Sequence, residues 1–143
     1  MDIAPELQSK VDAFFAQAQA SLIDTLGIEM LTVTPDEIRA RMPVNDRTKQ
    51  PFGILHGGAS VALAETLASF GAWLRIDSSS HTAVGIEINA NHVRPVSEGW
   101  VLGTAKPIHS GASTQIWEVR ICTEEGKLVS ISRCTMAIIK NRN

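Results

Sequence analysis

Apolar and polar residues recur with two different periods along this chain, and each period predicts its own elements. Residues 5–21 are amphipathic and rich in helix formers, and Pro5 occupies a position that the first turn of a helix tolerates. Residues 57–75 form a longer segment that is apolar on nearly every side, which predicts a buried helix. Residues 37–42 alternate with a period of two, which predicts a strand.

Four further strand-like stretches follow the long helix, after a polar break at 76–81. The turn EEG (residues 124–126) joins the last two, and the loop 44–53 precedes the helix. One central helix and about five strands predict an α+β fold, in which an antiparallel sheet wraps around that helix. The four stretches are 82–94, 100–108, 114–122 and 127–139, and Trp117, Val119 and Ile121 share one face of the third.

The chain length of 143 residues and the lack of a repeat or linker predict one domain over residues 1–143, with an N-terminal helical segment at about 1–25. The 13 basic and 15 acidic side chains nearly balance, which argues against nucleic acid or an anionic membrane as the main partner. The first residues lack the basic and apolar regions of a signal peptide, and the long helix has too few large apolar residues to span a membrane.

The two cysteines, Cys122 and Cys134, form neither a CxxC motif nor a plausible metal site. We expect both to be small core residues in a reduced, cytoplasmic protein. The sequence indicates no metal and no cofactor.

A single carboxylate, Glu65, interrupts the apolar helix within QPFGILHGGASVALAETLAS, residues 50–69. An unpaired buried carboxylate costs several kcal/mol or takes up a proton. Glu65 is therefore either a structural residue, which is capped, paired or directed out through a gap, or a catalytic one. Ser69 lies one turn later and shares its face of the helix.

The string LHGG introduces this helix and gives its first turn two glycines. Free N–H groups and the positive end of the helix dipole make such a turn suitable as an oxyanion hole, with Gly57 as the donor. The glycines can equally serve only a tight turn into the helix. His56 can either brace this loop or take part in catalysis.

Gly57 and Glu65 are eight residues apart, which is roughly 12 Å of helix rise. A donor and an attacking group must lie about 3 Å from the same carbon, so one helix does not easily supply both. Two antiparallel helices in a two-fold dimer can supply them, twice. The spacing therefore predicts an obligate dimer in which Glu65 of one chain faces Gly57 of the other.

The same string, together with VGIEINANHVRP at 84–95, resembles the hotdog-fold acyl-CoA thioesterases. The resemblance covers about 37–139 and is nearest to the branch that acts on aromatic acyl-CoAs. That branch includes the 1,4-dihydroxy-2-naphthoyl-CoA thioesterase of menaquinone synthesis and the proofreading thioesterase of enterobactin synthesis. The resemblance implies a homotetramer built as a dimer of dimers, and it is compatible with a role of the protein in menaquinone biosynthesis.

Carried over by position, the resemblance assigns the reacting centre. Glu65 matches the catalytic carboxylate, and Gly57 matches the glycine whose N–H polarises the thioester carbonyl. Gln50 and His56 match side chains beside the carbonyl, and Ser69 matches a small hydroxyl residue near the carboxylate. Glu65 would then either attack the carbonyl or activate a water, and both routes require it to be ionised.

The resemblance places the coenzyme A end of an acyl-CoA substrate at two segments. One is His92 with Arg94, and the other is the loop 109–114; either can also be an ordinary solvated surface. The loop departs from its relatives, because Ala112 and Ser113 stand where a basic residue is usual, which puts tight phosphate contact in doubt. The loop residues assigned to coenzyme A are His109, Ser110 and Gly111.

The acyl group is expected beside the helix after Glu65. Phe70, Ala72 and Trp73 would suit a flat hydroxyaryl group, although aromatics at this spacing are often plain core. Two other functions stay open. His56 and Glu65 can be the pair of a hydratase or dehydratase of acyl thioesters, or the chain can bind acyl-CoA without catalysis.

Overall fold

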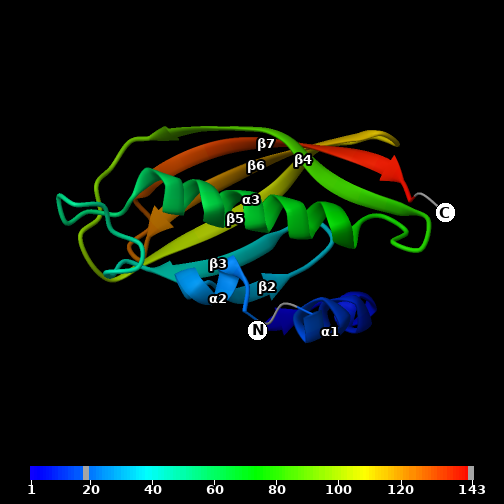
Figure 1. Cartoon of the computed structure of the whole chain (residues 1–143), viewed down its shortest axis with the longest axis horizontal. Helices are drawn as coiled ribbons and strands as arrows, with labels where there is room; N and C mark the ends of the chain where they lie inside the picture. The colour runs from blue at the N-terminus through cyan, green and yellow to red at the C-terminus, as the bar shows by residue number, and fades with distance from the viewer. Residues whose placement is uncertain (18–19, 142–143) are drawn as a thin grey trace.

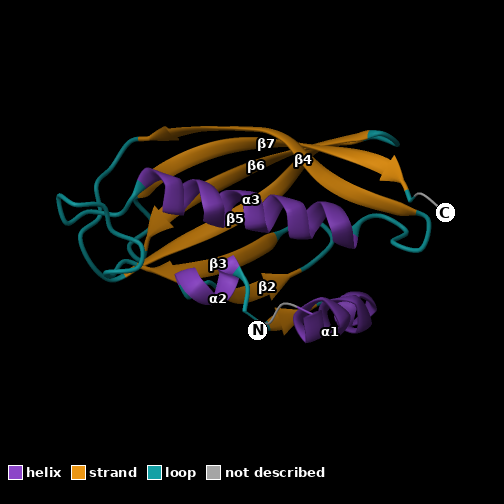
Figure 2. Cartoon of the chain, viewed as in Figure 1, coloured by secondary structure: helices purple, strands orange, loops and turns teal. Residues whose placement is uncertain are grey.

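The computed structural model describes residues 1–17 and 20–141, and its central element is a long helix, α3 (Gly57–Leu74). The helix lies across the concave face of one strongly curved sheet (Figure 1; Figure 2). Every pair of neighbouring strands is antiparallel except the pair β1 and β2, which is parallel. The predicted α+β fold, with a sheet curved around a central helix, is confirmed.

Among the described residues, the sheet has seven strands in the order β1-β2-β3-β5-β6-β7-β4. The five predicted strands correspond to β3 to β7, with each end within two residues of its predicted place. The sequence prediction missed β1, which has only two residues, and β2, whose alternation is broken by a bulge between Met30 and Thr32. The strands are β1 (Asp2–Ile3), β2 (Glu29–Val33), β3 (Ile38–Pro43), β4 (His81–His92), β5 (Trp100–Ser110), β6 (Thr114–Thr123) and β7 (Leu128–Lys140).

The N-terminal segment differs from the single helix predicted at 5–21. A 3₁₀ turn at Pro5–Leu7 leads into α1 (Gln8–Gln17), and a separate helix, α2 (Leu22–Leu26), follows. The predicted helix also spanned residues 18–19, which lie outside the described residues. Ser21 caps α2 through a reciprocal capping box with Asp24, and this local start signal divides the segment.

The core lies between α3 and the sheet. Trp117, Val119 and Ile121 of β6 are fully buried on the face that the alternation predicted. Two glycines permit a close approach of helix and sheet. A Cβ on Gly71 would lie 2.5 Å from Cη2 of Trp117, and a Cβ on Gly103 would lie 2.7 Å from Cδ1 of Leu67. This close packing fixes the rotation of α3 about its own axis.

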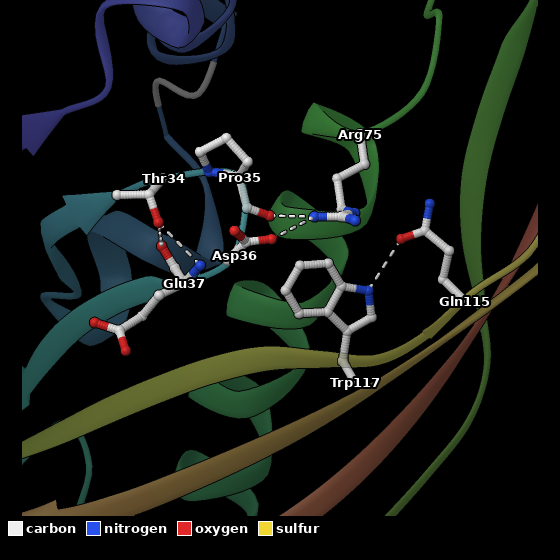
Figure 3. Close-up of polar contacts among 7 residues, drawn as sticks. All are labelled: Thr34, Pro35, Asp36, Glu37, Arg75, Gln115 and Trp117. Carbon is white, nitrogen blue, oxygen red and sulfur yellow. Dashed lines mark hydrogen bonds and ion pairs between the residues drawn. The ribbon is translucent and has the colours of Figure 1, made fainter.

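Polar contacts hold the C-terminal end of α3 to the rest of the fold (Figure 3). The guanidinium of Arg75 donates to the carbonyl of Pro35 and lies 3.3 Å from Asp36, in the turn between β2 and β3. Below the helix, Nε1 of the buried Trp117 donates to Gln115 at 3.1 Å. The buried indole N–H therefore has a partner, which the core requires.

Within residues 1–17 and 20–141, no helix is both long enough and apolar enough to cross a membrane. Both cysteines are free; Cys134 is buried and Cys122 is half-buried.

Gly71→Ala is expected to lower the free energy of unfolding by about 1–3 kcal/mol, because the new methyl group overlaps the indole ring of Trp117. Urea denaturation followed by tryptophan fluorescence measures the loss. In a Trp117→Phe background the smaller ring leaves room, so the same substitution should cost less there. An equal loss in both backgrounds would contradict the proposed clash.

Candidate functional site

Glu65 lies on the face of α3 that the sheet does not cover. The helix is apolar nearly all round, which predicted a buried carboxylate, but Glu65 is exposed in the single chain. That prediction is wrong because close packing on the sheet buries one side of α3 and leaves the other side, including Ala62 and Thr66, partly open. A Glu65 directed out through a gap was one form of the structural alternative that the sequence left open.

The carboxylate of Glu65 lies against Gly85 on β4. A Cβ on Gly85 would come within 2.8 Å of Oε1 of Glu65, so only glycine leaves room for the carboxylate in this position. The pairing of β4 with β7 shifts between Gly85 and Glu87, which is a bulge beside the carboxylate. The sequence prediction did not include Gly85, although a glycine within a strand pattern is a signal of such a bulge or close approach.

A cavity of about 500 Å³ opens beside Glu65. Ser69 lines it as well, so the predicted shared face is confirmed, but the Ser69 hydroxyl donates to the sulfur of Met136 at 3.8 Å. Among the described residues, Ser69 therefore forms no hydrogen bond with Glu65, although the two lie on the same face. Of the three expected acyl-pocket residues, Phe70 and Trp73 line this cavity, whereas Ala72 is fully buried elsewhere.

Three residues of the N-terminal segment also line the cavity beside Glu65, and the sequence prediction missed them. They lie more than forty residues from Glu65 in sequence, so no local pattern reveals the contact. They are Phe14, Leu22 and Ile23.

The N-terminal end of α3 presents an open backbone donor. His56 caps the helix, because its Nδ1 accepts a hydrogen bond from the N–H of Gly58 at 2.8 Å. The N–H of Gly57 has no hydrogen-bond acceptor among the residues that the structure describes. The loop-bracing role considered for His56 is therefore present, and the donor that the cap leaves free belongs to Gly57.

Gly57 lines a second cavity of about 410 Å³, together with Gln50, His92 and Arg94. The side-chain oxygen of Gln50 accepts from the N–H of Phe52 at 2.6 Å, which fixes the turn before the helix. The imidazole of His92 lies over Gly57, since a Cβ there would be 2.9 Å from Nε2 of His92. In one chain, this cavity and the cavity beside Glu65 are separate.

The loop residues expected at coenzyme A lie at the other end of α3. Ser110 and Gly111 line a cavity of about 370 Å³ with Arg75, Asp77 and His81, and the ring of His109 packs against Gly111. The 18 residues of α3 span about 27 Å, so one chain does not bring this loop together with His92 and Arg94. Hydrogen bonds from Ser79 and then Ser80 lower the pKa of Asp77, which keeps a negative charge in this cavity.

No three His, Cys, Asp or Glu side chains are grouped as metal ligands in the part of the chain that the structure describes. The site thus has the carboxylate of Glu65 beside an apolar cavity. It also has the free N–H of Gly57 in a second cavity, which the side chains of Gln50, His92 and Arg94 line. A carboxylate and a polarising N–H are the groups needed for attack on a carbonyl carbon.

Comparisons with known proteins agree with this chemistry. The family model of the thioesterase superfamily matches residues 52–130. The chain is similar to the 1,4-dihydroxy-2-naphthoyl-CoA hydrolase of Escherichia coli, at 44% identity over 90% of this chain and 94% of that protein. It is also similar to the proofreading thioesterase EntH of Cronobacter turicensis, at 43% identity over 90% of this chain and 93% of the relative. A crystal structure of a mutant thioesterase from Pseudomonas aeruginosa superposes with a TM-score of 0.87, at 42% identity over 91% of this chain and 94% of the other.

Cys134 is expected to resist alkylation in the folded protein. Burial, and then the charges of Glu65 and Glu87, raise the pKa of its thiol from 9.0 to about 11, so the reactive thiolate is scarce near neutral pH. Iodoacetamide at pH 8, followed by mass spectrometry, should modify the half-buried Cys122 and reach Cys134 only in urea. Because the raised pKa favours the native thiol, its contribution to stability is present below pH 9 and is lost as the pH rises toward 11. Rapid labelling of Cys134 in the native protein would contradict the expected resistance to alkylation.

Proposed function

This chain belongs to the thioesterase superfamily and hydrolyses thioesters; we propose that its substrates are aromatic acyl-CoAs, cleaved by Glu65 of one subunit against Gly57 of another. The observation that carries the proposal is the separation of the two reacting groups. Glu65 opens into one cavity and the free N–H of Gly57 into another, about 12 Å further along the same helix. A second copy of the chain, running antiparallel, supplies the missing group at each end.

The free edge of β4 supports this dimer. β4 lies at the edge of the sheet, is twelve residues long and pairs only with β7 among the described strands. Ile86 on this edge is 62% exposed and Val84 is 39% exposed. A long edge strand with exposed apolar residues favours pairing with another strand, and antiparallel pairing of two β4 edges sets the two α3 helices antiparallel. We further propose that two such dimers form the tetramer.

The reaction then follows from the positions of the groups. The thioester carbonyl oxygen accepts a hydrogen bond from the N–H of Gly57, which draws charge from the carbonyl carbon. The ionised carboxylate of the partner's Glu65 attacks this carbon or removes a proton from an attacking water, and coenzyme A leaves as the thiol. Gln50, whose side-chain oxygen is held by the N–H of Phe52, directs its amide N–H₂ toward the substrate.

His56 is better suited to holding the loop than to acting as a base. Its Nδ1 is already engaged by Gly58, which leaves only Nε2 for a reaction. This weakens the rival assignment of His56 and Glu65 as the pair of a hydratase. The other alternative, an acyl-CoA-binding protein without catalysis, is disfavoured because the relatives are named as a hydrolase and a thioesterase.

The coenzyme A end is proposed to lie at His92 and Arg94, with the loop His109, Ser110 and Gly111 contributed by a neighbouring subunit. His92 and Arg94 line the cavity of Gly57 and can face phosphate groups. The loop carries Ala112 and Ser113 in place of a basic residue, and Asp77 adds a negative charge to its cavity. We therefore propose that Arg94, with Arg75 beside the loop, provides most of the positive charge.

The aromatic lining of the cavity beside Glu65 favours an aryl acyl group. Phe70 and Trp73 are nearly parallel, at an interplanar angle of 18°, and such faces stack on flat rings. The Escherichia coli relative is named for 1,4-dihydroxy-2-naphthoyl-CoA. We propose a hydroxyaryl-CoA substrate of the same class, a place in menaquinone biosynthesis, and a cytoplasmic setting in which Cys122 and Cys134 stay reduced.

Glu65→Gln is expected to lower the turnover of benzoyl-CoA and dihydroxynaphthoyl-CoA by roughly a thousandfold, because the amide neither attacks nor accepts a proton. A colorimetric thiol reagent follows coenzyme A release, and sedimentation checks that the assembly is unchanged. Glu87→Gln is the matched control, since Glu87 lies near on β4 but outside the proposed machinery. An unaltered rate in Glu65→Gln would remove Glu65 from the chemistry, and loss of enoyl absorbance without thiol release would favour a hydratase.

Mixing two inactive variants tests the shared site. Gly57→Val places a side chain against His92, in the cavity that the donor faces. In a dimer of one Glu65→Gln chain and one Gly57→Val chain, one site carries both defects and the other carries none. Refolding an equal mixture should restore roughly a quarter of wild-type turnover, because half the dimers are mixed and each has one intact site. No recovery in mixtures with verified exchange would place both groups in the same chain.

A further inference from the structure

The cavity beside Glu65 ends in three aromatic rings, one of which comes from the N-terminal segment. The ring centroid of Phe14 on α1 lies 4.5 Å from that of Phe70 and 5.8 Å from that of Trp73. These rings line the cavity toward the C-terminus of α3, whereas Glu65 lies at the middle of the helix. Of these three rings, Phe14 is the one that does not belong to α3.

Contacts that precede Phe14 in the chain hold α1 in place. Nζ of Lys10 donates to the carbonyls of Leu74 at 3.2 Å and Ile76 at 2.7 Å, at the end of α3 where carbonyls lack helical partners. Val11 is fully buried, and the N–H of Ala4 donates to Val33 at 2.9 Å. Phe14 is therefore carried by an anchored helix beside the C-terminal half of α3 (Figure 1).

The room between the carboxylate and the rings limits what can bind there. Glu65 and Trp73 are eight residues apart, about 12 Å of helix. An acyl group whose carbonyl lies beside Glu65, and which extends toward Trp73, meets the ring of Phe14 at the far end. One or two fused rings fit in this space and stack on the aromatic faces, but a long linear chain collides with them.

We propose that Phe14 is a specificity-determining residue, which closes the acyl pocket and excludes long acyl chains. This inference rests on the proposed function, because it takes the cavity beside Glu65 as the acyl pocket. It assigns selectivity for the acyl group to the N-terminal segment, outside the part of the chain that carries the reacting groups.

The test compares Phe14→Ala with Phe15→Ala. Phe15 is the neighbouring ring on α1 and also packs near Phe70, with a centroid distance of 6.2 Å, but it does not line the cavity.

Calorimetry measures the binding of two thioethers that cannot be hydrolysed, S-hexadecyl-CoA and S-phenacyl-CoA. Phe14→Ala should shift the affinity ratio toward the hexadecyl compound by roughly tenfold or more, and Phe15→Ala should leave the ratio unchanged. Thermal melts confirm folding, and Phe14→Leu replaces Phe14→Ala if the latter does not fold.

The outcomes separate this inference from the proposed reaction. An unchanged ratio in Phe14→Ala, equal shifts in both variants, or no binding of either thioether would overturn the role of Phe14. Hydrolysis of acyl-CoAs by the wild type, measured as thiol release, would then still stand. A Phe14-dependent ratio in a protein that releases no thiol would support the pocket and reject hydrolysis.

Discussion

The close packing of α3 on the sheet is the constraint from which the rest of the site follows. At Gly71 the helix comes so near to Trp117 that a single methyl group does not fit, and Gly103 permits a similar approach from β5. A helix held this closely cannot rotate, so the face it turns away from the sheet is fixed. Glu65, Ser69 and Trp73 follow one another at four-residue intervals along that face, which places a carboxylate beside an apolar cavity.

The two ends of α3 differ in their hydrogen-bond partners. The C-terminal end is tied to the rest of the fold, whereas the N-terminal end keeps a donor free for a ligand. At the C-terminal end, Lys10 satisfies the carbonyl of Leu74, and Arg75 ties the helix to the turn between β2 and β3. At the N-terminal end, His56 caps Gly58 and leaves the N–H of Gly57 open to a cavity that the guanidinium of Arg94 also lines. An N-terminal donor is useful to a ligand only if the cap leaves it free, because a satisfied N–H has nothing to offer a developing oxyanion.

The sequence predicted those parts of the fold whose signals are local. Alternation located β3 to β7, and the apolar run with its glycines located α3 to within one residue. Glu65 was identified as a candidate because a charged residue is unusual in an apolar helix. Its predicted burial was wrong, because periodicity does not tell which side of a helix the sheet covers. Phe14, Leu22 and Ile23 were missed because they reach the cavity from a distant segment, and only tertiary packing brings them there.

The proposed reaction and the proposed substrate preference depend on different parts of the chain. The superfamily match covers residues 52–130, which include Gly57 and Glu65, but it does not reach Phe14, Leu22 or Ile23. A chain can therefore share the proposed reacting groups with its relatives and still have different side chains beside the acyl group. Membership of the superfamily predicts cleavage of a thioester, whereas the choice of acyl group has to be argued from the side chains that close the cavity. In the proposed acyl pocket one of those side chains, Phe14, lies on a helix that Lys10 anchors to the end of α3, so the proposal ties the choice of acyl group to the position of α1.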